Sequence, residues 1–429
     1  MRIVLLFLFL IKSFFVLGQL NAVSIDSTSA ILCKNNLSNE FKTKFEIINK
    51  NTNYFNNAER NIIKEICSNS QNEFLDRIKS NDFLCNNTET IYLQKLLNEI
   101  LTKNKINASD YKILLSKDSE VNAANLGDGI VIVNYGMFLT VENEDELMFV
   151  ISHEVGHQCL NHVKQSIENY AKLSTSKEIV DKTKAIQRQK FGKATKANDL
   201  LKNLIYQNYN QRRKKEIAAD SLGLSLYLKT LRNPKAAVTI LEKLNISDKE
   251  KDSLSIADYK SIFEKDQFKI KQRYFTAEES LFSKYDTEKK IEVDSLKSHP
   301  ACSKRIELIN KYFNNNFKGN DIKSSEFDQI KKQSISQNLL NLFSEKRFGE
   351  SLYETLKLYN NDKENKFYKN LIFSCLVQIQ KSRANYTINR YIPSYDVKNN
   401  TESMNRFITF INNIKTTDLD IITNNFKPL

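Results

Sequence analysis

Residues 143–162 read NEDELMFVISHEVGHQCLNH, and they include three of the four histidines of the chain. The spacing HExxH places His153 and His157 one turn apart on the same helix face, where two neutral imidazoles can reach one zinc ion. Glu154 lies ~100° further round the helix, where it can act as a general base on water without binding the metal. The stretch therefore predicts a buried helix that carries a hydrolytic zinc site.

The ends of this helix can also be predicted. Asn143 followed by Glu146 matches a capping box, so we expect the helix to begin near Glu144 and to continue past His162. On a continuous helix His162 faces away from His153, and Leu160 stands where a metzincin would need Gly. We therefore expect His162 not to be a ligand.

A third ligand is predicted in the downstream segment Glu216-Ile217-Ala218-Ala219-Asp220. Glu216 and Asp220 share a helix face, so the first can bind the metal while the second hydrogen-bonds the outer nitrogen of a ligand histidine. The two small alanines would let this helix pack closely on the HExxH helix.

Composition favours a mainly helical protein, because nine Gly and four Pro in 429 residues are too few for a turn-dense all-β fold. Strand patterns are confined to residues 111–115, 120–124 and 130–133, with a turn at 127–129. The predicted fold class is α+β, mainly α. The domains we expect are a helical lead-in over 19–89, a zinc peptidase domain over 90–315 with a helical insertion at 225–290, and a C-terminal helical bundle or repeat-like domain over 316–429.

The N-terminus predicts export. A basic start precedes the apolar run Ile3–Leu17, which is too short for a membrane span of ~20 residues and contains Lys12. Residues 1–18 therefore match a signal peptide, with an uncleaved membrane anchor as the alternative. We expect a periplasmic or secreted protein, in which six cysteines allow 15 disulfide pairings. Cys159 and Cys302 are either neighbours at the site or two buried free thiols.

The net charge of +13 favours anionic partners, such as a membrane surface or a wall polymer. No recognised nucleic-acid-binding motif accompanies the basic residues, so we expect no nucleic-acid partner.

Several blocks of sequence stand in order over residues 90–315. They are Val121-Asn122-Ala123-Ala124 with Gly129–Val133, then residues 143–147 with 153–157 and His162, then Glu216–Asp220, and finally His299-Pro300 with Arg305. In this order they resemble the M48 peptidases, a family of gluzincins. The chain departs from the membrane-embedded branches of that family, whose membrane helices it lacks, and it carries a long segment between Glu216 and His299.

The resemblance implies a zincin-like peptidase domain with one zinc ion per chain. The metal ligands would be His153, His157 and Glu216. Glu154 would be the general base, and Asp220 would support a ligand histidine. His299 would approach the metal or the scissile carbonyl, where it would gate the site or, with Arg305, stabilise the oxyanion. Asn122 would lie on an edge strand to which substrate adds by β-pairing.

The function expected from these features is hydrolysis of extended or misfolded polypeptides outside the cytoplasm. The alternative is a latent protease that acts mainly as a chaperone-like protein, binding a protein partner through its C-terminal helices.

Overall fold

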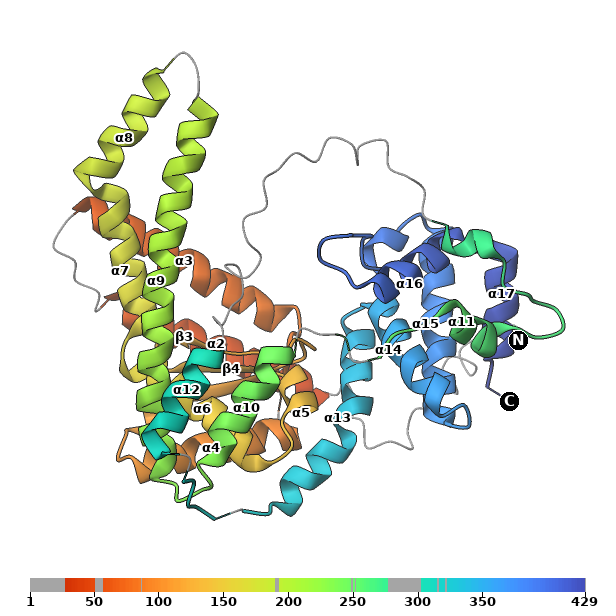
Figure 1. The fold of residues 1–429 in the computed structure, drawn as a ribbon, viewed down its shortest axis with the longest axis horizontal. Coiled ribbons are helices and arrows are strands. Elements are labelled where there is room, and N and C mark those ends of the chain that lie inside the picture. The colour runs from red at the N-terminus through yellow and green to blue at the C-terminus, as the bar shows by residue number, and fades with distance from the viewer. Residues whose placement is uncertain are drawn as a thin grey trace. The chain divides into compact units, whose positions relative to one another are not determined.

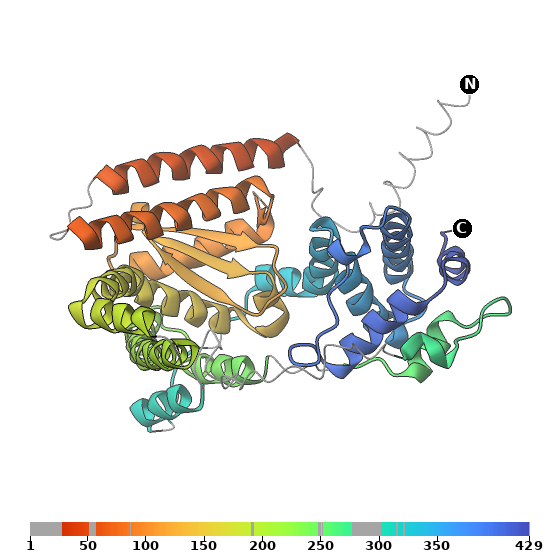
Figure 2. The same cartoon turned by 90° about the horizontal axis from the view of Figure 1, so that it is seen from above.

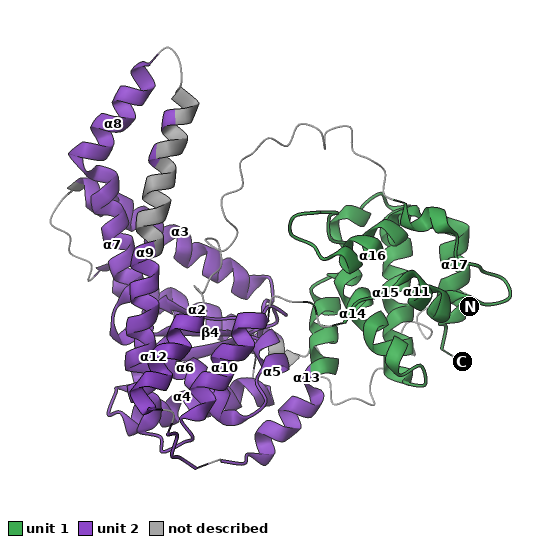
Figure 3. Ribbon diagram, in the orientation of Figure 1, with its two compact units in different colours: residues 1–25, 248–289, 335–429 green, residues 26–247, 290–334 purple. Residues whose placement is uncertain are grey.

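The structure is a computed structural model that describes residues 28–50, 57–85, 87–189, 193–247, 250, 252–276, 302–314, 316–320 and 322–428. The predicted signal peptide and His299 lie outside these residues. The described chain forms two compact units (Figure 3). The sheet unit comprises the described residues of 26–247 and 290–334, and the helical unit those of 248–289 and 335–429.

The sheet unit is built on a four-stranded mixed sheet with the order β1-β2-β4-β3. Strand β1 (Phe83–Leu84) pairs antiparallel with β2 (Lys112–Ser116), and β2 pairs parallel with β4 (Ile130–Asn134). Strand β3 (Ala123–Gly127) pairs antiparallel with β4 and forms an edge of the sheet.

The turn predicted between β3 and β4 is found at residues 127–129. Gly127, Asp128 and Gly129 all have positive φ angles, of 85°, 52° and 74°. A Cβ atom at Gly129 would lie 1.8 Å from the carbonyl oxygen of Asp110, so the close approach of that backbone also requires glycine here.

Helices cover both faces of the sheet. Ile113, Leu115 and Val131 belong to the same core as α4 (Thr88–Lys103) and α6 (Glu144–Cys159). The alternating residues, including Leu114 and Ile132, pack with α2 (Thr28–Lys50) and α3 (Asn57–Lys79), which lie over the sheet in Figure 2.

The first two helices therefore do more than lead into the domain, which we had expected to begin at residue 90. Phe41 and Phe74 are buried under the sheet, and a disulfide joins Cys33 in α2 to Cys85 just after β1. Residues 28–85 thus form part of the same folded unit as the sheet.

The sheet unit contains further elements. They are η1 (Ala108–Asp110), α5 (Gly136–Thr140), α7 (His162–Thr175), α8 (Lys177–Arg188), α9 (Lys193–Leu228), α10 (Lys235–Ile246), α12 (Cys302–Phe313) and the first half of α13 (Ser325–Ser344). Of these, α8 and the neighbouring part of α9 extend away from the sheet (Figure 1). Helix α6 packs against α9 and α10, and α10 packs against α12.

The helical unit has its own core. Its elements are α11 (Ile256–Phe263), η2 (Gln272–Phe275), the second half of α13, α14 (Phe348–Asn361), α15 (Lys366–Ala384), η5 (Ile388–Arg390), α16 (Glu402–Asn413) and α17 (Thr416–Asn425).

The helical insertion that we expected at residues 225–290 is divided between the two units. Its helix α10 belongs to the sheet unit, whereas Tyr259 and Phe263 of α11 and Tyr274 of η2 are buried with Phe410 of α16. These three aromatic residues therefore bury their surface in the helical unit, and residues 277–290 lie outside the described part of the chain.

The fold class is α+β, mainly α, as predicted. Within the described ranges, none of the helices is both long enough and apolar enough to cross a bilayer.

Candidate active site

Two helices approach each other at backbone contact to form the site. A Cβ atom at Gly223 of α9 would lie 2.8 Å from the Cα of His153, and one at Gly156 of α6 would lie 2.9 Å from the carbonyl oxygen of Ala219. Ala218 and Ala219 predicted a close approach of α9 to the HExxH helix, but the contact is made at the two glycines. Their close approach brings Glu216 of α9 to the two histidines of α6.

The ligand atoms of His153, His157 and Glu216 converge on one point. The two Nε2 atoms lie 3.1 Å apart, and Glu216 carboxylate oxygens lie 3.4 Å from the His153 Nε2 and 3.5 Å from the His157 Nε2. Tetrahedral zinc with bonds of ~2.0–2.2 Å holds its ligand atoms about 3.3–3.6 Å apart. The two distances to Glu216 lie within this range and the distance between the two Nε2 atoms is slightly shorter, so the three side chains can close around one metal ion, and they are a candidate metal-binding group in the structure.

The outer nitrogen of His153 is held by a carboxylate, as predicted for Asp220. His153 Nδ1 lies 2.9 Å from Asp220 Oδ1. Arg305 of α12 in turn donates two hydrogen bonds to Asp220, from Nε at 2.6 Å and from Nη2 at 2.7 Å. Its Nη1 lies 3.6 Å from Glu216, so one buried guanidinium contacts both carboxylates behind the ligand atoms.

These contacts set the charges of the buried groups. Burial disfavours the charged form of His153, but its contacts with Asp220 and Glu216 raise the pKa to about 10. Burial also opposes ionisation of Asp220, but Arg305 and His153 together lower the pKa of that carboxyl. In the metal-free protein His153 is therefore the charged imidazolium at neutral pH, and a metal ion that binds has to displace the proton on Nε2.

His162 is placed differently from our prediction. Helix α6 ends at Cys159 instead of continuing, and Asn161 adopts a left-handed conformation with φ 52°. The chain therefore turns back, and His162 Nδ1 lies 3.0 Å from His157 Nδ1. His162 is not in the metal-binding group, but it contacts the outer nitrogen of a ligand histidine.

The surroundings of His162 favour a neutral ring, which can accept a hydrogen bond. Burial and the nearby Lys215 ammonium lower the pKa of His162, so the ring is neutral at pH 7. A neutral imidazole can accept the Nδ1 hydrogen of His157, which fixes the orientation of that ring and leaves its Nε2 free to bind metal.

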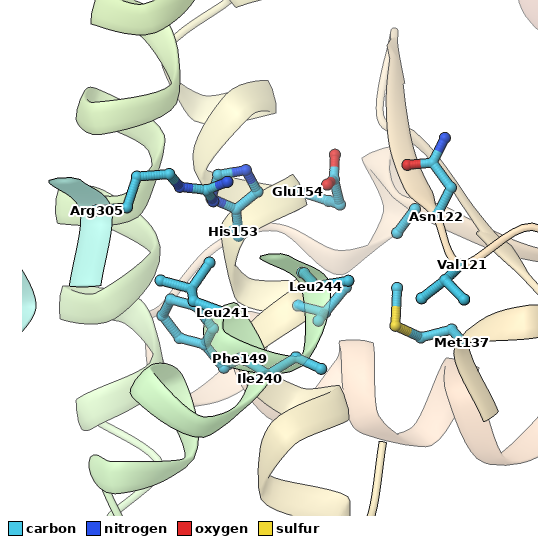
Figure 4. A pocket seen from close by; sticks show the side chains of 12 residues that line it. Val121, Asn122, Met137, Phe149, His153, Glu154, Ile240, Leu241, Leu244 and Arg305 are labelled. Atoms are coloured by element: carbon cyan, nitrogen blue, oxygen red, sulfur yellow. The ribbon is translucent and has the colours of Figure 1, made fainter. Parts of the chain in front are cut away.

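Glu154 borders a small pocket next to the ligand group. Figure 4 shows Arg305 and His153 on one side of this pocket, Asn122 and Val121 on the other, and Glu154 between them. Asn122 immediately precedes β3, and its carbonyl oxygen accepts a hydrogen bond from the backbone of Asn134. The structure thus brings together the predicted site residues except His299, which lies outside the described residues.

The two cysteines near the site are not bonded to each other. Cys159 is exposed with its Sγ 3.6 Å from the Tyr111 hydroxyl, and Cys302 is buried at the start of α12. The alternative of two buried free thiols is therefore correct for Cys302 but not for Cys159, whose thiol is free and exposed.

An HExxH helix joined to a glutamate on a second helix defines the class of protein as a metallopeptidase. The sequence profile of peptidase family M48 matches residues 87–312, so the chain belongs to this family and is a metalloprotease. It is similar to the mitochondrial metalloendopeptidase OMA1 of Schizosaccharomyces pombe, with 27% identity over 165 residues. The match covers 37% of this chain and 45% of that relative.

Proposed function

We propose that this metalloprotease is a zinc endopeptidase in which His153, His157 and Glu216 bind one zinc ion and Glu154 is the general base. The separations of 3.1–3.5 Å between the three ligand side chains carry the proposal. Two imidazoles and one carboxylate form a typical ligand set of a catalytic zinc, which keeps a further position for water or substrate.

The chemistry follows from these positions. A bound zinc ion supplies Lewis acidity, which polarises a carbonyl group and makes water easier to deprotonate at neutral pH. Glu154 accepts a proton from the attacking water as its oxygen bonds to the carbonyl carbon of the substrate. The same carboxyl then donates that proton to the amide nitrogen as the C–N bond breaks.

The surrounding residues hold the ligands in position. Asp220 fixes the ring of His153, and His162 fixes the ring of His157. The bidentate contact between Arg305 and Asp220 supports a role for Arg305 in orienting that carboxylate. A direct contact of Arg305 or His299 with the oxyanion stays a prediction.

We further propose that the substrates are extended or misfolded polypeptides. Strand β3 is an edge strand that runs beside the site, and such an edge can pair with the backbone of an extended chain. Asn122, at the start of that edge and beside Glu154, would contact the substrate near the bond that is cleaved.

Export from the cytoplasm is part of the proposal. The apolar N-terminal sequence predicts a signal peptide, and the Cys33–Cys85 disulfide supports an oxidising compartment. Secretion from cells, followed by sequencing of the mature N-terminus, tests this part. A mature chain that begins near residue 19 is expected, and a cytoplasmic protein with a reduced Cys33–Cys85 pair would contradict it.

The metal site is tested by measuring bound zinc and proteolysis of an unfolded protein for the wild type, Glu216→Gln and Glu242→Gln. Glu242 is exposed on α10 and serves as the control. We expect one zinc per chain in the wild type and the control, and loss of both zinc and turnover in Glu216→Gln. A wild type that binds zinc but never cleaves would support the latent, chaperone-like alternative.

A further inference from the structure

A basic helical arm begins next to the candidate active site. The arm comprises residues 162–215, which form α7, α8 and the part of α9 that precedes Glu216. Its 54 residues contain fourteen Lys and Arg against four Asp and Glu, so the arm carries +10 of the net charge of +13. The other 375 residues are nearly balanced in charge, and the positive excess of the chain is therefore concentrated in this one segment.

The base of the arm is attached to the candidate ligand group. His162, the first residue of the arm, contacts His157, and Glu216 directly follows the last residue. Lys215 joins the two sides of the base, because its ammonium group donates hydrogen bonds to the His162 carbonyl oxygen, at 2.9 Å, and to the Ser166 hydroxyl, at 2.5 Å. The position of the arm is therefore fixed at the site.

The edge strand β3 leads from the general base to this arm. Asn122, at the start of β3, lines the same pocket as Glu154. At the other end of the strand, a Cβ atom at Gly127 would lie 3.3 Å from the side chain of Val163, in the first turn of α7. A polypeptide that pairs with this edge therefore runs from Glu154 towards the base of the arm.

The projecting part of the arm presents cations to solvent. Helix α8 packs against α7 and α9, and it extends away from the sheet together with the neighbouring part of α9 (Figure 1). Among the described residues, Lys182 is the one cation of α8 that forms an ion pair, with Glu178. The exposed cations of the described part of the arm include Lys172, Lys177, Lys184, Arg188, Arg212, Arg213 and Lys214.

The distribution of these charges favours a flexible acidic chain over a flat anionic surface. At ~100° per residue, the consecutive Arg212, Arg213 and Lys214 point in directions spread over about 200° around α9. A polypeptide can wrap around such an arm, whereas a bilayer meets one side of it. Helices that lie on membranes also insert an exposed apolar face. The large apolar residues of α8 are instead partly buried, and they are Ile179, Val180 and Ile186.

We propose that the basic arm binds an acidic segment of the polypeptide substrate, outside the site of cleavage, and so selects which polypeptides are cleaved. The inference rests on the proposed function, because the substrate has to pair with β3 for its flanking segment to reach the arm. Many exposed cations acting together attract an acidic chain over a distance, and this attraction falls with ionic strength.

The length of the arm limits where the acidic segment lies. Helix α9 begins at Lys193 and carries Glu216, so at ~1.5 Å per residue the arm reaches about 35 Å from the ligand group. An extended polypeptide covers ~3.3 Å per residue, so about ten residues span the arm and about five more pair with β3. Acidic residues should therefore act roughly five to fifteen residues from the cleaved bond, and only on the side that leads to the arm.

The first test uses pairs of peptides that share a cleavable sequence and differ in an added extension of about ten residues. The extension contains several Glu in one peptide and Gln at the same positions in the other, and it is placed on either side of the cleaved bond. For the full chain loaded with zinc, kcat/KM at low salt should be about tenfold higher for the Glu peptide on one side, through a lower KM. In 1 M NaCl, where the Debye length is ~3 Å, the difference should fall below about twofold.

The two proposals fail in different ways in this test. Equal kcat/KM for the Glu and Gln peptides on both sides would overturn the role of the arm and leave the peptidase proposal intact. A zinc-loaded wild type that cleaves none of the peptides would instead overturn the peptidase proposal.

A second test reverses charges on the arm. The arm variant combines Lys184→Glu with Arg188→Glu, two exposed positions of α8. The matched control combines Lys42→Glu with Lys50→Glu, two exposed positions of α2, which covers the face of the sheet turned away from α6. The arm variant should lose most of the preference for the Glu peptide and cleave the Gln peptide like the wild type. Equal preferences in the arm variant and the control, with folding confirmed by circular dichroism, would contradict the proposal.

Direct binding separates the arm from turnover. Fluorescence anisotropy of the labelled Glu peptide on Glu154→Gln should show binding at low salt that the two arm substitutions weaken by roughly tenfold. Equal affinities for the Glu and Gln peptides would overturn the proposal. It would also be overturned, in favour of a lipid surface, if vesicles of phosphatidylcholine and phosphatidylglycerol in equal amounts bound the wild type but not an arm variant whose preference for the Glu peptide is unchanged.

Discussion

Replacement of Gly223 by alanine should weaken metal binding, although alanine is the better helix former. The added Cβ would lie 2.8 Å from the Cα of His153, 3.0 Å from its backbone nitrogen and 3.0 Å from the Ser152 carbonyl oxygen. All three atoms belong to the backbone of α6, so no side chain can move aside. Carbon atoms normally pack at ~3.5–4.0 Å, so α6 and α9 have to separate by roughly 0.7 Å or more.

The separation acts directly on the ligand geometry, because Glu216 is on α9 and the two histidines are on α6. A metal site tolerates deviations of only ~0.2 Å in its bond lengths, several times less than the expected shift. Overpacking costs ~1–3 kcal/mol, whereas replacing Gly by Ala in a helix gains ~1 kcal/mol. We therefore expect a small loss of stability in the metal-free protein and a fall of zinc affinity by on the order of 10- to 100-fold.

The assay is competition for zinc with a chromophoric chelator, together with chemical unfolding of the metal-free protein. Ser225→Ala is the matched control, because Ser225 is exposed on the same helix and gives the gain in helix propensity without the contact. Zinc affinity of Gly223→Ala equal to that of Ser225→Ala would refute the argument that the close approach of the two helices sets the ligand distances.

Three further outcomes are expected. His162→Ala should weaken zinc binding by ~10–100-fold although it removes no metal ligand. His162→Gln retains a hydrogen-bond acceptor and should recover part of this loss. Equal zinc affinities for the wild type and His162→Ala in the chelator assay would contradict the role of His162. Because the pKa of His153 is raised to about 10, zinc has to displace a proton from this residue when it binds. The apparent affinity for zinc should therefore rise about tenfold per pH unit between pH 7 and 9. Calorimetry in buffers of different ionisation enthalpy should detect the released proton. The stability that this charge gives the metal-free protein should be complete below pH ~6.5 and lost as the pH rises towards the folded pKa, whereas stability that is level from pH 7 to 10 would contradict the shift. Reduction of Cys33–Cys85, which are separated by 52 residues, should cost about 4 kcal/mol of unfolding free energy in urea titrations, and a loss near zero would show that α2 is held by packing alone.

The ligand group could be predicted from sequence because its geometry is local to two helices. Helical periodicity alone places His153 beside His157 and Glu216 beside Asp220, and the structure joins the two pairs. What periodicity could not give is the distance between the helices, which depends on the glycines facing each other at the crossing.

The position of His162 was mispredicted because the helix ends earlier than its apolar pattern suggests. Asn161 is the signal that could have been used, since asparagine tolerates the left-handed conformation that ends helices. Once the chain reverses there, a residue that would face away on a continuous helix lies against His157.

The layer that α2 and α3 form over one face of the sheet could also have been predicted from the sequence. Residues 130–133 form an uninterrupted apolar run, which is typical of a strand buried on both faces. One face is covered by α4 and α6, so the run required a second helical layer. The division of the insertion at 225–290 had no such signal, because Phe410, on which Tyr259 and Phe263 both pack, lies more than a hundred residues further along the chain.

The most direct test of the proposed chemistry compares the wild type with Glu154→Gln for zinc content and for cleavage of an unfolded protein. We expect one zinc per chain in both proteins and a loss of turnover of at least ~100-fold in Glu154→Gln, because the variant retains the metal ligands and loses only the general base. Equal turnover in the two proteins would contradict the assignment of Glu154, and a folded wild type that binds no zinc would contradict the zinc site itself.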